Sequence, residues 1–406
     1  MDLREKLNLH ISEIKKALFG MDEVIKIFCL TKAVGLSTLL LGDHGVAKSD
    51  LFRKWSISCG LDYRIVTSSE VDEGLLAYID PAHFRKYNEV KMRPGELMLR
   101  DHILIDEYFL WNNKYRAKLH QLLEEGTYAG CKVQTKAYTF SSTPLTEYYA
   151  GQISDVNIAT QDRIDTVLLM FQPDITSTEK LLRKFSEQGA HEDVPQEKYT
   201  PKQVISWDDY IQMKKEILKV EIPPETARWL ILFAESMSSC KYVNSKFGVS
   251  KAELRKLCRG CNEQENICSR VAISKPRFIR ATVLLAKAIA WFNKRNFVDV
   301  SDVREAIKYT LPHRLVFLRR ERNIQEAFSY VNRLVATFDE EYDNWKSRGI
   351  FQTLEAISAN AKSYGERQSE QELVDKLLVE TQECLPISKY VTETIKNLEI
   401  PTKYDN

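Results

Sequence analysis

A glycine-containing loop, set between a short apolar run and a helical pattern, most constrains what this chain can fold into. Residues 37–41 before the loop predict a buried strand, and residues 50–58 after it predict a helix. This order is typical of phosphate-binding loops, in which backbone N–H groups and the following helix surround the phosphates of a nucleotide. The nucleotide-binding residues that we expect are Gly42, Asp43, His44, Gly45, Val46, Ala47, Lys48, Ser49 and Asp50.

Two residues of the loop have chemistry of their own. We expect Lys48 to contact the outer phosphates and the Ser49 hydroxyl to bind Mg²⁺. Ala47 stands where the usual pattern has a second glycine, and alanine fits there without strain if its φ is negative. The alternative is an ordinary strand-to-helix turn that happens to contain a lysine.

A second motif, residues 102–107, has four residues of strand character followed by Asp106 and Glu107. Ligands of parallel α/β sheets bind at the carboxyl ends of the strands, where these two acids would lie. We expect Asp106 to hold Mg²⁺, directly or through water, and Glu107 to act as the general base on the attacking water. Alone, the motif would be read as a strand end with a solvated acidic turn.

Length and composition set broader limits. A chain of 406 residues suggests two or three domains, and 44% apolar residues suffice for their cores. The net charge of +1 implies no general attraction to nucleic acid or membranes. No apolar run approaches the ~20 residues of a membrane span, and residues 1–6 open a charged helix rather than a signal peptide. Eight cysteines in a chain this long do not make a disulfide scaffold, so we expect a reducing, cytoplasmic setting.

Hydrophobic patterning predicts an α/β fold with a parallel five-stranded sheet and helices on both faces, then a helical lid domain and a mostly helical C-terminal extension. The predicted strands are 37–41, 63–67, 102–107, 138–142 and 166–171. The predicted helices are 3–18, 23–34, 50–58, 114–125, 208–218, 224–239, 277–294 and one that starts at 301. The predicted domains are 1–180 for nucleotide binding, 181–205 as linker, 206–315 as lid with an insertion at about 240–270, and 316–406 as extension.

Two further features are ambiguous. Residues 68–91 form a polar stretch that Arg93-Pro94-Gly95 turns back, and its basic residues could line a pore or substrate path. A solvated hairpin face is the interpretation we favour for them; they are Arg85, Lys86, Lys91 and Arg93. Thr143 follows a predicted strand, where it could hold a water near the γ-phosphate or simply be a turn residue.

The ordered set of motifs resembles the AAA+ ATPases and, in detail, their MoxR/RavA branch. Residues 42–49 and 105–107 are similar to Walker A and Walker B, and Arg93-Pro94-Gly95 to the end of an inserted hairpin. The matches elsewhere are residues 20–25 with the entry helix, 122–126 with the helix end after Walker B, 162–163 with the arginine finger, 274–277 with sensor 2 and 311–315 with the end of the lid. His44 departs from the usual proline, and Thr143 from the usual sensor 1 asparagine.

This resemblance implies a ring, usually a hexamer, that hydrolyses ATP with Mg²⁺ at sites shared between subunits. It implies that Arg163 acts on a neighbour's γ-phosphate and that Arg277 acts within its own subunit. It also implies that the ring remodels, assembles or activates a client protein, as a chaperone would, beside a partner with a von Willebrand A domain. The alternatives are a nucleic-acid motor, because the loop also resembles that of the MCM helicases, and a nucleotide-bound scaffold with little turnover.

A zinc site in the insertion is a further hypothesis. Cys258 and Cys261 have the C-x₂-C spacing that lets two sulfurs face one ion, and Cys240 and Cys268 could complete a tetrahedral set. A second knuckle is missing, so four unligated thiols are the alternative that we favour.

Overall fold

The structure, a computed structural model, describes residues 2–143, 162–172, 176–179, 199–237, 267, 271–317, 324–359, 368–382, 384–398 and 400. Two compact units make up the chain: Met1–Glu221 with Arg280–Val298, and Ile222–Ile279 with Asp299–Asn406. We call them the first and the second unit. Helix α12 (Lys275–Phe292) begins in the second unit and continues in the first.

Five parallel strands form the sheet of the first unit, in the order β2-β5-β8-β1-β9. The strands are β1 (Thr38–Leu41), β2 (Tyr63–Val66), β5 (His102–Ile105), β8 (Ala137–Ser142) and β9 (Thr166–Leu169). Both β1 and β5 are buried along their whole length, as strands covered on two faces are. The predicted five-stranded parallel sheet is confirmed.

Helices cover both faces of this sheet, as two neighbouring residues of β8 show. The Thr139 hydroxyl contacts the His102 ring, which lies against Trp55 of α3 (Lys48–Ser58). The next residue, Phe140, points to the opposite face and packs on Tyr108, whose hydroxyl bonds to His120 of α5 (Asn113–Glu125). The alternation of side chains along a strand therefore separates an α3 layer from an α5 layer.

Three more of the described helices belong to the α3 layer of the first unit. They are α1 (Leu3–Lys15), α2 (Asp22–Val34) and α9 (Trp207–Leu218), and α1 packs on α2 and α3 while α2 packs on α9. Each has apolar residues at helical spacing that become buried, such as Leu7, Ile11 and Ile14 of α1. Helix α9 begins at a capping box in which Ser206 and Asp209 bond reciprocally to each other's backbone.

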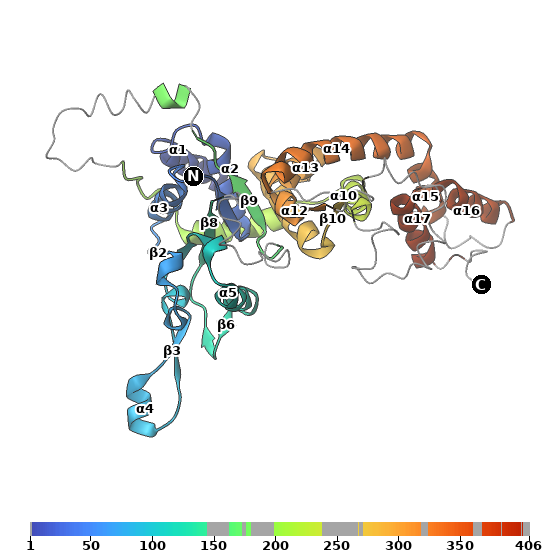
Figure 1. Ribbon diagram of the computed structural model, residues 1–406. Helices are drawn as coiled ribbons and strands as arrows, with labels where there is room; N and C mark the ends of the chain where they lie inside the picture. The colour runs from blue at the N-terminus through green and yellow to red at the C-terminus, as the bar shows by residue number, and fades with distance from the viewer. Residues whose placement is uncertain are drawn as a thin grey trace. The chain divides into compact units, whose positions relative to one another are not determined.

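A hairpin leaves the sheet between β2 and β5 and carries a helix at its tip (Figure 1). Its strands β3 (Ala77–Ile79) and β4 (Met92–Pro94) pair antiparallel, and α4 (Pro81–Tyr87) connects them. The sequence predicted a polar hairpin here without the helix. The helix begins because the Asp80 side chain accepts bonds from the backbone N–H groups of Ala82 and His83.

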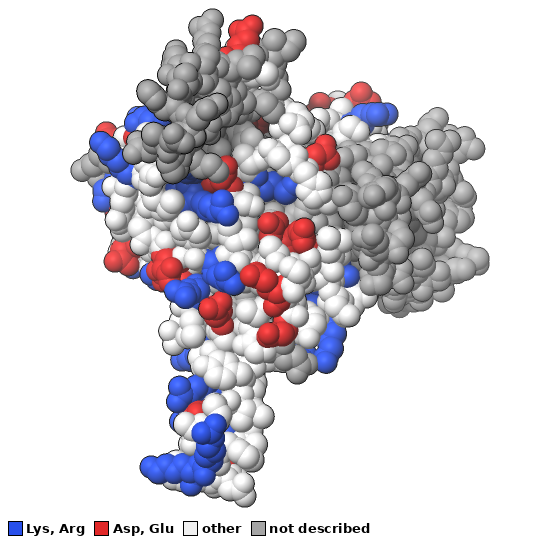
Figure 2. Space-filling model, turned by 60° about the vertical axis from the view of Figure 1, so that its left-hand side comes forward, with Lys and Arg blue, Asp and Glu red and all other residues white. Residues whose placement is uncertain are grey.

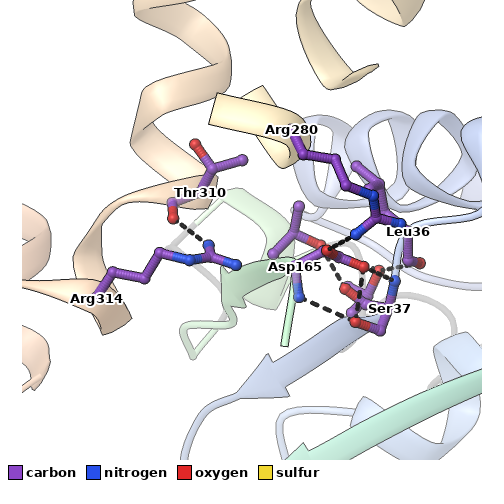
Figure 3. A network of polar contacts seen from close by, with 8 residues as sticks. Leu36, Ser37, Asp165, Arg280, Thr310 and Arg314 are labelled. Carbon is purple, nitrogen blue, oxygen red and sulfur yellow. Dashed lines mark hydrogen bonds and ion pairs between the residues drawn. The ribbon is translucent and has the colours of Figure 1, made fainter. Parts of the chain in front are cut away.

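Asp165, at the start of β9, joins segments of the first unit that are far apart in the sequence (Figure 3). One carboxylate oxygen accepts from the backbone N–H and the hydroxyl of Ser37, both at 2.9 Å. The other accepts from Arg280 of α12, also at 2.9 Å. The starts of β1 and β9 and one turn of α12 are thereby fixed to one side chain.

The second unit is helical, as predicted. Its helices are α10 (Pro224–Ser236), α13 (Val300–Thr310), α14 (Ile324–Ser347), α15 (Ile350–Ala359), α16 (Gln368–Thr381) and α17 (Leu385–Asn397), beside a small ribbon of β10 (Val271–Ala272) and β11 (Val316–Phe317). Its core is aromatic: the Trp229 ring lies 5.2 Å from Phe233 and 5.1 Å from Phe338. Across the described ranges of both units, no helix has the length and apolarity that crossing a bilayer requires.

Candidate active site

The loop after β1 is shaped by two glycines. A Cβ atom on Gly42 would lie 2.4 Å from the carbonyl oxygen of Met170, which follows β9, so only glycine fits there. Gly45 has a φ of +82°, a conformation that glycine adopts without strain. The chain then enters α3 at Lys48.

Ala47 differs from the sequence-based expectation. Its φ is +60°, so the condition under which alanine would fit without strain is not met. A left-handed conformation brings the Cβ of an L-residue too close to its own carbonyl oxygen and costs roughly 1–2 kcal/mol. Ala47 therefore has the left-handed backbone conformation that glycine adopts without strain.

Lys48 is held inside the loop by backbone oxygens. Its ammonium group donates to the carbonyl of Gly42 at 2.5 Å and to that of Asp43 at 2.8 Å. Partial burial lowers the pKa of Lys48, and the carboxylates of Asp106 and Asp43 oppose that shift. Phosphate oxygens could take the place of the two carbonyls, since all are acceptors for the same ammonium.

Asp106 follows β5, and its backbone N–H donates to the carbonyl of Val66 on the neighbouring strand. One carboxylate oxygen accepts from the Ser141 hydroxyl, and the other lies 3.4 Å from the Ser49 hydroxyl. A carboxylate beside a hydroxyl gives the hard oxygen ligands that Mg²⁺ requires. The residues present therefore fit the expected ion.

Glu107 has a φ of +51°, an uncommon conformation for a residue with a side chain. Its backbone N–H donates to the Asp106 carboxylate at 2.9 Å, and its own carboxylate accepts from the hydroxyl of Ser68. Ser68 lies just after β2, which is the strand next to β5. Sequence reasoning missed Ser68, although its position after a neighbouring strand is the signal that could have found it.

One pocket of about 370 Å³ gathers most of the predicted residues. Its walls are formed by His44, Gly45, Val46, Ala47, Lys48, Ser49, Asp50, Arg53, Asp106, Glu107, Ser142 and Thr143. Arg53 and Ser142 were not predicted. Of the predicted loop, Gly42 and Asp43 lie outside the wall and contribute the carbonyl groups that hold Lys48. The volume is in the range of small-molecule sites in proteins.

Residues 262–329 match the family described as AAA lid domain. The fold is similar to the crystal structure of a candidate ATPase from Cytophaga hutchinsonii, with a TM-score of 0.62 and 17% sequence identity. The similarity covers 82% of this chain and 94% of that chain. The chain has the fold of the AAA+ ATPases. The match to the lid family and the residues that line the pocket together support the interpretation of this chain as an AAA+ ATPase.

Neither of the two arginines expected to complete an AAA+ site is among the residues that line this pocket. Arg163 lies between β8 and β9 in the sequence. Its side chain lies 3.3 Å from a carboxylate oxygen of Glu124, near the end of α5. Arg277 belongs to the first turn of α12, in the second unit.

The cysteines considered as zinc ligands lie outside the described residues, and so does nearly all of the predicted insertion at 240–270. They are Cys240, Cys258, Cys261 and Cys268. Among the residues that the structure does describe, no cluster of three metal-binding side chains occurs.

Proposed function

We propose that this chain is a Mg²⁺-dependent ATPase that hydrolyses ATP to ADP and phosphate. The observation that carries the proposal is the convergence of two separate motifs on one pocket. Lys48 and Ser49 come from the loop after β1, while Asp106 and Glu107 come from the end of β5. A phosphate-binding cation, two oxygen ligands for Mg²⁺ and a carboxylate base are the groups that phosphoryl transfer to water needs.

Each residue has a role that follows from its contacts. Lys48 exchanges its carbonyl acceptors for phosphate oxygens, and the Ser49 hydroxyl and the Asp106 carboxylate hold Mg²⁺. The ion, when bound, neutralises charge on the outer phosphates. Glu107 accepts a proton from the water that attacks the γ-phosphorus, while the bond to the bridging oxygen breaks and ADP leaves. Thr143, on the pocket wall, offers a hydroxyl that can orient this water.

The same proposal extends to assembly. We propose a MoxR-type chaperone that forms a hexameric ring. In this ring Arg163 contacts a neighbour's ATP and Arg277 contacts the ATP of its own subunit. The position of Arg163 outside the pocket wall of its own chain supports the role toward a neighbour. Client proteins, a partner with a von Willebrand A domain and a cytoplasmic location complete the proposal.

Two variants test the chemistry. Lys48→Ala should lose affinity for a fluorescent ATP analogue, because the ammonium for the phosphates is gone. Glu107→Gln should keep that affinity and lose about 10²–10⁴-fold in turnover, because only the base is removed. Glu125→Gln is the matched control, since it makes the same change on an exposed residue of α5 outside the pocket wall.

Phosphate release and analogue binding, measured on the same preparations, decide the outcome. Wild-type turnover in the Glu107→Gln protein would contradict the assignment of the base. A wild-type chain that binds ATP and shows no turnover would support the nucleotide-bound scaffold instead.

A further inference from the structure

The hairpin between β2 and β5 forms a projection that the proposed chemistry does not use. We call residues 77–94, which comprise β3, α4 and β4, the arm. In Figure 1 the arm extends from the sheet of the first unit with α4 at its far end. In Figure 2 Lys and Arg side chains gather at the tip of this projection.

The arm is held in shape by its own contacts. The Asp80 carboxylate caps α4 and also pairs with Arg93 at 2.7 Å, so one buried side chain ties the helix to β4. At the base, Gly95 donates its N–H to the carbonyl of Leu76 at 2.9 Å. A Cβ on Gly95 would lie 2.3 Å from two backbone oxygens, so the two sides of the base are in close contact. The arm is therefore a preformed element.

This preformed element leaves its apolar side chains uncovered. Helix α4 has no buried residue, and Phe84, Tyr87 and Val90 are 45%, 54% and 65% exposed. Of the fifteen large apolar side chains that are exposed among the described residues, the arm has five; they are Tyr78, Ile79, Phe84, Tyr87 and Val90. Such a concentration on one small element is typical of an interaction surface.

The exposed charge of the arm is positive. The Asp80 carboxylate pairs with Arg93, and the exposed Glu89 carboxylate lies 3.8 Å from the His83 ring. Four Lys and Arg residues against two carboxylates give the arm a net charge of +2. Within the part of the chain that the structure describes, Arg85, Lys86 and Lys91 make no ion pair. Three cations without an ion pair, set among aromatic and aliphatic side chains, complement a ligand that is acidic and apolar at once.

We propose that the arm binds acidic segments of a client polypeptide that also contain aromatic or aliphatic residues. This inference rests on the proposed function, in which the client is a protein, and it names the class of segment that is recognised. A single-stranded nucleic acid fits less well, because the exposed Ile79 and Val90 side chains of the arm offer no aromatic face on which a base could stack.

The test uses the full chain and fluorescently labelled probes, with binding measured by anisotropy. The probes are a short peptide that alternates Glu and Asp with Phe and Leu, the same peptide with Gln and Asn for the acids, the same with Lys for the acids, and single-stranded DNA. We expect the acidic peptide to bind tightest. Changing Arg85, Lys86 and Lys91 to Gln should lower the affinity for the acidic peptide about tenfold, because each of three exposed ion pairs adds a modest amount to the binding free energy.

Three exposed lysines of the same unit provide the matched control. Changing Lys214, Lys215 and Lys219, in and just after α9, to Gln removes the same charge away from the arm and should leave peptide affinity unchanged. Charge reversal sharpens the test: the arm of the triple variant Arg85→Glu, Lys86→Glu, Lys91→Glu should bind the Lys peptide more tightly than the acidic one. A separate double variant, Phe84→Ser with Tyr87→Ser, should lower the affinity for the acidic peptide, although the charge of the arm stays the same.

The inference is overturned if no peptide binds, if DNA binds tighter than the acidic peptide, or if the α9 control weakens binding as much as the arm variant. Binding is measured without hydrolysis. Peptide recognition by a protein with no turnover would therefore refute the proposed function and leave the arm's role standing.

Discussion

At the scale of single residues, the pocket combines two non-glycine residues in the left-handed conformation. The described chain has five such residues, and two of them, Ala47 and Glu107, belong to the pocket wall. Each is the residue at which the backbone enters a helical turn: Ala47 precedes α3, and Glu107 precedes the short 3-10 turn Tyr108–Leu110. Strained backbone of this kind is kept when the surrounding structure fixes it, and it gathers at functional sites.

Ala47→Gly should make the protein more stable by about 0.5–1 kcal/mol. Removing the Cβ relieves roughly 1–2 kcal/mol of strain. The greater freedom of glycine in the unfolded chain cancels about 0.4–1 kcal/mol of this gain. The measurement is urea unfolding of both proteins without nucleotide.

Two other alanines serve as controls for this change. Ala129 has a φ of +49° in an exposed turn, so Ala129→Gly should also stabilise the protein. Ala82, in the first turn of α4, should behave in the opposite way and lose stability on change to glycine. If Ala47→Gly lowered the free energy of unfolding as Ala82→Gly does, the result would contradict the conclusion that the backbone is strained at Ala47.

At the scale of elements, the α3 layer encloses two buried histidines. His10 of α1 lies 2.9 Å from the Ser58 hydroxyl at the end of α3. His102 of β5 lies between the hydroxyls of Ser56 and Thr139, at 2.8 and 2.9 Å. Burial lowers the pKa of His10 to about 3 and that of His102 well below its ordinary value. Both rings are therefore neutral in the folded protein.

His10→Gln should weaken the acid sensitivity of folding. The unfolded chain binds a proton at His10 below pH about 6.5, whereas the folded chain does so only near pH 3. The contribution of His10 to the free energy of unfolding is therefore fully present above pH about 6.5. It falls as the pH decreases, by at most about 1.4 kcal/mol per pH unit. Glutamine keeps a hydrogen-bonding group and removes the titration.

The measurement is the free energy of unfolding as a function of pH between 6.5 and 5, where the slope rather than the absolute value is compared. We expect a shallower slope in His10→Gln. Asn8→Gln, at an exposed position of the same helix α1, is the control; it removes no titratable group and should leave the slope as it is in the wild type. An unchanged slope in His10→Gln would mean that this histidine is not held neutral by the fold.

At the scale of the whole molecule, the proposed ring makes each catalytic site depend on two chains. Arg163→Ala should bind ATP normally and hydrolyse it slowly, because the arginine for the neighbour's γ-phosphate is missing. Mixing it with Lys48→Ala subunits should restore turnover in part, since some interfaces then contain both an intact pocket and an intact Arg163.

The control for this mixture is a double variant, Lys48→Ala with Arg163→Ala, in which no interface with Arg163→Ala subunits can be complete. Turnover is followed across mixing ratios, with mixed assemblies verified by differently tagged subunits. Mixed assemblies that form without any recovery of turnover would rule out a shared site.

The sequence allowed the sheet and the centre of the site to be predicted because their signals are local. A fully buried parallel strand is an apolar run, so β1 and β5 were recognisable, and the motifs after them name Lys48 and Asp106. Ser68 and Ser141 were missed because their contacts with the acids arise only when parallel strands bring their ends together. Helix α4 was missed because its seven residues, none of them buried, have no apolar periodicity, although Asp80-Pro81 is a helix-start signal.

The discontinuity of the first unit affects how the protein can fold while it is being synthesised. Arg280 and Trp291 belong to this unit, and they contact Asp165 and Glu216, which emerge from the ribosome much earlier. At about 5–20 residues per second, the early part waits on the order of several seconds for the end of α12. During that interval the surface that Trp291 later covers is open to solvent. A chaperone that binds apolar surface on nascent chains would find its target there, and slower translation of residues 222–279 would lengthen the time for which this target is open.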